Sequence, residues 1–173
     1  EYTGDYGLGT PDEARPVLRE FHQRRAEALA SASPDLLAIE TIPSGVEAEA
    51  IVDVLDTLGD VPAWVSFSCA DDRRLHDGTP IEVAVEAVAG SPAVVAVGVN
   101  CTAPAHVPAL IRRVATVTDK HLVGLVMVDH DQVEPCLLRR RQRLVGGDAA
   151  IDRDDDGGAL ILQPQQRRRI GAV

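Results

Sequence analysis

The sequence predicts an α/β protein built on a parallel sheet. Short apolar runs alternate with amphipathic segments at intervals of roughly 30 residues, which is typical of successive βαβ units. Each apolar run ends in polar residues, as expected where strands reach the sheet edge that carries binding sites. The chain has 173 residues and 45% apolar content, enough for one domain with a real core. It is short for a complete eight-stranded barrel, which needs about 250 residues.

The first predicted helix begins after Thr10 and ends near Pro34. Thr10 can cap it, Pro11 is tolerated at the first helical position, and Glu13 can reach back to the cap. Its apolar side is expected to consist of Val17, Leu18, Phe21, Ala28 and Leu29. Further helices are predicted at residues 46–58, 81–89 and 104–117, where apolar residues recur at helical spacing.

Four apolar runs are predicted to be strands, at residues 36–39, 61–68, 94–99 and 121–128. The run at 94–99 contains small and β-branched residues throughout, which indicates a strand covered on both faces. Polar residues follow three of the runs: Glu40 follows the first, Ser66 to Cys69 the second and Asn100 to Thr102 the third. These residues are therefore the candidates for a site.

The pattern changes after residue 128. Three low-complexity runs rich in charged and polar residues follow, and they contain little apolar material for a core. We therefore expect an α/β domain over residues 1–128 and a divergent, poorly ordered tail over residues 129–173.

Charge and cysteine content restrict the partners. A net charge of −10 and a pI near 4.8 argue against a nucleic acid or an anionic membrane. No apolar run approaches the roughly 20 residues of a membrane span. Three widely spaced cysteines do not suggest a disulfide framework. A cytoplasmic location is expected.

Cys101 and Glu40 each have an ordinary and a functional interpretation. A cysteine at a strand exit is often a packed side chain, but it can also be a metal ligand, for which Cys69 is a possible companion. Glu40 is either a rim residue paired with a cation or an acceptor for a substrate ammonium. Cys101 with His106 could also form a hydrolase nucleophile and base. The five histidines show no metal-binding helical spacing and are expected at the surface: His22, His76, His106, His121 and His130.

Four segments, in this order and at matching intervals, resemble the homocysteine S-methyltransferase family. The likeness runs from residue 1 to about residue 125. The segments are Glu-Tyr-Thr-Gly-Asp-Tyr at 1–6, Glu-Thr-Ile-Pro at 40–43, Trp-Val-Ser-Phe-Ser at 64–68 and Gly-Val-Asn-Cys-Thr at 98–102.

The resemblance implies a (β/α)₈ TIM barrel that binds zinc through three cysteines and methylates homocysteine to methionine. The methyl donor would be a sulfonium compound, S-methylmethionine or S-adenosylmethionine. By position in the motifs, Cys101 would be one zinc ligand and Glu40 would contact the homocysteine amino group, with Asn100 also expected to bind substrate. Bound zinc would lower the pKa of the homocysteine thiol.

The sequence also departs from the family. The family's carboxy-terminal Gly-Gly-Cys-Cys element is missing, since the segment at 146–149 reads Gly-Gly-Asp-Ala. We therefore expect central strands of a barrel joined to an unrelated tail, of the kind a reading-frame shift produces, with one zinc ligand and no activity alone. The alternative hypothesis is a non-catalytic α/β domain that binds a small molecule or a partner through open strand edges.

Overall fold

A computed structural model describes residues 3–124 and 170–172. Helices and strands alternate along the first of these ranges. The helices are α1 (Pro11–Ser31), α2 (Gly45–Leu55), α3 (Ile81–Ala89) and α4 (Val107–Val117). The strands are β1 (Leu36–Ile42), β2 (Ala63–Phe67), β3 (Val94–Val99), β4 (His121–Gly124) and β5 (Ile170–Ala172).

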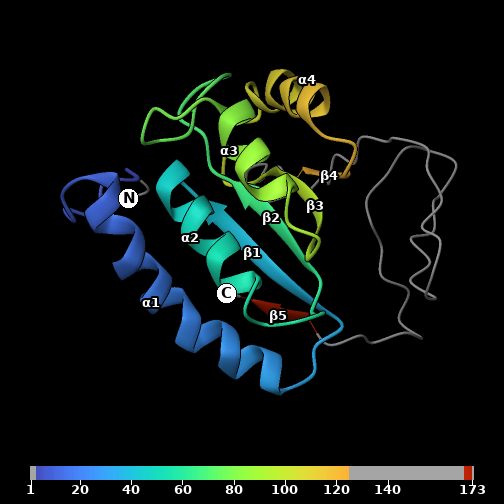
Figure 1. The fold of residues 1–173 in the computed structure, drawn as a ribbon. Helices are drawn as coiled ribbons and strands as arrows, with labels where there is room; N and C mark the ends of the chain where they lie inside the picture. Colours follow the sequence, from blue (N-terminus) through green and yellow to red (C-terminus); the bar gives the residue numbers. More distant parts are fainter. Residues whose placement is uncertain (1–2, 125–169, 173) are drawn as a thin grey trace, which may run out of the picture.

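One parallel sheet carries the described strands in the order β4-β3-β2-β1-β5. From β1 to β4 the spatial order follows the chain, and right-handed crossovers then put α2, α3 and α4 on the same face. Figure 1 shows α2 and α3 across one face of the sheet and α1 beside α2. The expected α/β fold with a parallel sheet is confirmed.

Strand register defines what each face of the sheet presents. Ile39 pairs with Val65, Val65 with Val97 and Val97 with Leu122, and this buried row packs in the core shared with the helices. Side chains alternate between faces along a strand. The neighbouring row, which consists of Ala38, Trp64, Ala96 and His121, therefore lies on the face away from the helices.

The start of α1 agrees with the prediction, but its buried face does not. The Glu13 carboxylate accepts hydrogen bonds from the backbone N–H and the hydroxyl of Thr10, both at 2.8 Å. The expected apolar side is only partly correct, since Val17 and Phe21 are exposed. The residues that α1 buries are Ala14, Leu18, His22 and Ala26. The prediction that His22 lies at the surface is therefore wrong: this imidazole is 4% exposed and hydrogen-bonds Glu47.

The predicted strands and helices are present, with boundaries that shift by a few residues. The shift that matters for the site concerns β1, which continues through Glu40 and Thr41 to Ile42 with a register irregularity after Ile39. Strand β5, which pairs with the first half of β1, was not predicted. Residues 125–169 lie outside the described part, so the boundary at 128 and the character of the tail stay predictions. No helix in the described residues is long and apolar enough to cross a membrane.

Candidate functional site

The carboxyl ends of β1 and β3 are joined by one buried amide. Asn100, which directly follows β3, accepts a hydrogen bond from the backbone N–H of Thr41 at 2.9 Å. Its Nδ2 donates to the Thr41 hydroxyl at 2.8 Å. Its own backbone N–H donates to the carbonyl oxygen of Phe67, the last residue of β2. Asn100 therefore fixes the exits of three neighbouring strands relative to one another.

Cys101 lies at this junction with its side chain open to solvent. Its sulfur accepts from the Thr41 hydroxyl at 3.5 Å and from Asn100 Nδ2 at 3.8 Å. Cys101 and Thr41 have positive φ angles of 46° and 65°. Such angles are uncommon outside glycine, and for a β-branched threonine the cost must be offset by the surrounding contacts. The exposed thiol excludes the interpretation of Cys101 as a packed core side chain, and its role as a metal ligand stays a prediction.

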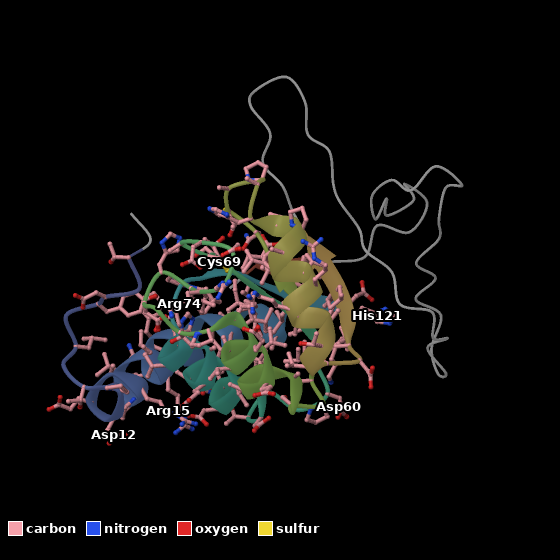
Figure 2. The ribbon with its side chains drawn as sticks, turned by 90° about the horizontal axis from the view of Figure 1, so that it is seen from above. Asp12, Arg15, Asp60, Cys69, Arg74 and His121 are labelled. Atoms are coloured by element: carbon pink, nitrogen blue, oxygen red, sulfur yellow. The ribbon has the colours of Figure 1, made fainter. Side chains whose placement is uncertain are left out.

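Cys69 has the opposite environment. It is 4% exposed and belongs to the core, and its backbone N–H donates to the Thr102 hydroxyl at 2.9 Å. Burial raises the pKa of the Cys69 thiol to about 12. Figure 2 shows Cys69 among packed side chains, whereas Asp12 projects outward from the start of α1. Cys69 is therefore a neutral core thiol.

Glu40 and Trp64 meet on the sheet face away from the helices. The Trp64 indole N–H donates to Glu40 Oε1 at 3.2 Å, and both side chains are partly buried. Glu40 lies one residue before Thr41, whose hydroxyl donates to the Cys101 sulfur, so the backbone of Glu40 borders the junction of strand exits. Of the three residues that the sequence singled out, Asn100 and Cys101 both contact Thr41, and Glu40 precedes Thr41 in the chain; their roles as substrate and metal ligands stay predictions.

A cavity of about 250 Å³ adjoins the exit of β1. Its wall contains Glu40 and Thr41 on one side and residues of α1 and of the segment before it on the other. Glu47, buried in the first turn of α2, joins these parts by accepting hydrogen bonds from the Tyr6 hydroxyl and from His22. Burial and the nearby Glu47 carboxylate raise the pKa of Tyr6.

The metal-binding potential of the described residues is limited. Within residues 3–124 and 170–172, no three His, Cys, Asp or Glu side chains are grouped so as to hold a metal ion. Tetrahedral zinc needs three or four protein ligands, and Cys101 supplies one. The described residues alone therefore do not fit a zinc site. Within residue range 3–124, Cys101 also has no hydrogen bond with His106, so the hydrolase alternative gains no support.

Sequence reasoning missed three contributors to the site: Thr41, Trp64 and the buried pair of His22 and Glu47. Trp64 carried a usable signal, because it is the single tryptophan of the sequence and lies in one of the segments that resemble the family. The other contacts join residues 25 to 60 positions apart, and periodicity gives no information on such pairs.

The class of fold follows from these observations. Sequential parallel strands with helices on one face and polar residues at the carboxyl ends are the construction of a (β/α)₈ barrel wall. The sequence model of the homocysteine S-methyltransferase family matches residues 2–135. The chain belongs to this family, and the resemblance stated from its motifs is confirmed.

Known relatives cover the same part of the chain. Homocysteine S-methyltransferase 4 of Zea mays is 43% identical over 124 residues, and homocysteine S-methyltransferase 1 of Arabidopsis thaliana is 39% identical over 124 residues. Each alignment covers 71% of this chain but only 35% and 37% of the respective relative.

A crystal structure of the homocysteine methyltransferase MmuM from Escherichia coli, in its metallated form, is similar to this fold. It has a TM-score of 0.64 and 38% sequence identity, covering 70% of this chain and 41% of that protein. The chain thus corresponds to a part of a TIM-barrel methyltransferase and spans little more than a third of the length of its curated relatives.

Proposed function

We propose that this chain is the amino-acid-binding part of a zinc-dependent homocysteine S-methyltransferase. Glu40 accepts a hydrogen bond from the homocysteine ammonium, Asn100 holds the strand exits on which the substrate lies, and Cys101 contributes one thiolate to the metal site of the whole protein. The observation that carries the proposal is the junction of strand exits. There the buried Asn100 amide donates to the solvent-accessible Cys101 thiol, and the partly buried Glu40 carboxylate, one residue before Thr41, accepts from the Trp64 indole.

The reaction proposed for the whole protein is a methyl transfer between sulfur atoms. The homocysteine thiol loses its proton to water, and the thiolate attacks the methyl carbon of a sulfonium donor, S-methylmethionine or S-adenosylmethionine. A new sulfur–carbon bond forms, and the bond to the donor sulfur breaks with its electron pair remaining on that sulfur. The products are methionine and a neutral thioether. The contribution of residues 3–124 is to bind and orient the amino acid.

The family to which the chain belongs is the reason for proposing zinc, since the described residues contain no complete set of zinc ligands. The donor set there holds a single accessible thiol, so we assign no step of the reaction to the metal in this chain. A metallated relative and the position of Cys101 support its role as one of several ligands. We expect the isolated chain to bind homocysteine without turning it over, and the whole protein to work in the cytoplasm.

The binding step can be followed with Trp64, the single tryptophan of the sequence, which donates to Glu40. We expect homocysteine to change the fluorescence of this indole in a saturable manner. Replacing Glu40→Gln removes the charge that pairs with the ammonium and should weaken binding about tenfold or more. The matched control is Glu20→Gln, an exposed carboxylate paired with Arg24 on α1. Equal affinity of the Glu40→Gln variant and the unmodified chain would refute the assignment.

Turnover is measured separately, by adding zinc and S-methylmethionine and assaying methionine. No turnover and no tight zinc binding are expected from the chain alone. If it binds one equivalent of zinc and forms methionine, the claim that it needs further ligands is wrong, and Cys101→Ser then identifies whether this thiol is one of them.

A second function has one observation in its favour, the lack of a three-ligand metal group in the described residues. In this alternative the chain is a non-catalytic domain that binds a small molecule or a partner. Two results would favour this alternative. Homocysteine would bind through Glu40 without any dependence on Cys101, and the chain would give no turnover when joined to a full family barrel.

A further inference from the structure

Trp64 lies between two alanines of the neighbouring strands. It is paired with Ala38 of β1 on one side and with Ala96 of β3 on the other. Both alanines are buried although the helices lie on the opposite face. Small neighbours on both strands leave room for a large ring, so the indole can lie across the sheet and reach the end of β1.

The indole reaches one oxygen of Glu40. Trp64 Nε1 donates to Oε1 at 3.2 Å, and within residues 3–124 the structure gives Oε2 no hydrogen-bond partner. A glutamate side chain has several rotatable bonds, and fixing it in one orientation costs conformational entropy. A hydrogen bond to one oxygen, made from a neighbouring strand, holds the carboxylate and leaves the other oxygen able to accept from a ligand.

The chemistry of the donor matters as well. An indole N–H donates a hydrogen bond and carries no charge. A lysine or arginine in its place would neutralise the carboxylate and compete with a cationic ligand. Trp64 therefore orients Glu40 while preserving the negative charge that an ammonium group requires.

We propose that Trp64 is a positioning residue that orients Glu40 for the ammonium group of an α-amino-acid substrate. This inference rests on the proposed function and adds how selectivity for the amino group arises. Trp64 acts through Glu40, so its contribution exists only when the carboxylate is present and only for ligands that carry the ammonium group.

A double-mutant cycle on the full 173-residue chain tests this role, with affinities measured by calorimetry because the fluorescent residue is altered. The variants are Trp64→Phe, Glu40→Gln and the combination of both. Phenylalanine keeps a ring and removes the N–H. We expect Trp64→Phe to weaken homocysteine binding about tenfold, the typical effect of losing a hydrogen bond to a charged group. In the Glu40→Gln background the same change should have no further effect.

A second ligand separates orientation from simple loss of structure. The probe is 4-sulfanylbutanoate, which is homocysteine without its amino group. Trp64→Phe should leave its affinity unchanged, so that the preference for homocysteine falls by the same tenfold. A merely structural role would weaken both ligands alike. The control is Val85→Ala, which removes buried volume from α3 in the helical layer and should lower stability without changing that preference.

The outcomes distinguish the two proposals. If Glu40→Gln leaves homocysteine affinity unchanged, the proposed function itself is refuted. If Glu40→Gln weakens binding but Trp64→Phe does not, or if the two effects add, the positioning role is refuted and the function stands. If Trp64→Phe does not fold, 3-benzothienylalanine incorporated at position 64 keeps the shape of the indole without its N–H and should give the same loss of preference.

Discussion

Replacing Asn100→Ala should destabilise the chain by about 3 kcal/mol. The Asn100 side chain is buried and makes two hydrogen bonds to Thr41, one through each polar atom of its amide. Each such bond contributes about 1 kcal/mol, and the Thr41 backbone N–H left without its acceptor adds about 1 kcal/mol more. The strained backbone of Thr41 would then lose the contacts that hold it. The structural effect should therefore extend to Glu40 and Cys101.

The assay is urea unfolding followed by Trp64 fluorescence. With a slope of about 2 kcal/mol/M, the midpoint should fall by about 1.5 M. Asn100→Asp keeps the acceptor for Thr41 but loses the donor, so its midpoint should lie between those of Asn100→Ala and the unmodified chain. The control is Thr116→Val, which removes a hydroxyl bonded to a carbonyl on the exposed side of α4 and should cost no more than about 0.5 kcal/mol. A loss below 1 kcal/mol for Asn100→Ala would refute the view that this amide holds the strand exits together.

Three further results are expected. Iodoacetamide should modify Cys101 in the native chain and reach Cys69 only on unfolding, because Cys69 is buried and its thiol pKa is raised to about 12. Peptide mapping by mass spectrometry identifies which of the two cysteines is modified. Tyr6 keeps its proton more firmly when folded, so its stabilising effect is complete below its unfolded pKa of about 10 and is lost as pH rises above that value. The melting temperature should therefore fall above pH 10 in the unmodified chain and fall less in Tyr6→Phe. Gly98→Ala should cost about 3 kcal/mol, because a Cβ at this position would overlap the backbone of β4, and an unchanged midpoint would contradict the close approach of the two strands.

Local patterns were sufficient to predict the elements and their order. The alternation of apolar runs with helical periodicity identified β3 and α3 to the residue, and the capping residues at Thr10 and Glu13 identified the start of α1. Polar residues at strand exits then indicated the sheet edge at which the candidate site is proposed. The parallel sheet is confirmed, and parallel strands necessarily bring their carboxyl ends to one edge, whatever the details of packing.

Long-range pairing was not predictable in the same way. The buried face of α1 was misjudged because His22 counts as polar in any periodicity, yet Glu47 provides a partner that makes its burial possible. Thr41, which has a positive φ, is hydrogen-bonded to Asn100, which lies 59 positions later. Neither effect has a local signature, so only the folded chain reveals them.

In the proposed function, consecutive strands supply different parts of the recognition site. β1 carries the carboxylate, β2 carries the indole that donates to it, and the residues after β3 carry the amide and the thiol. The contacts among these groups all lie within residues 40–101, and none of them uses a residue from β4 or β5. A continuous segment of two βα units and a third strand thus contains the residues to which the proposed function assigns amino-acid binding beside a thiol. The described residues lack a matching set of metal ligands, and we therefore expect binding and turnover to be separable in this chain.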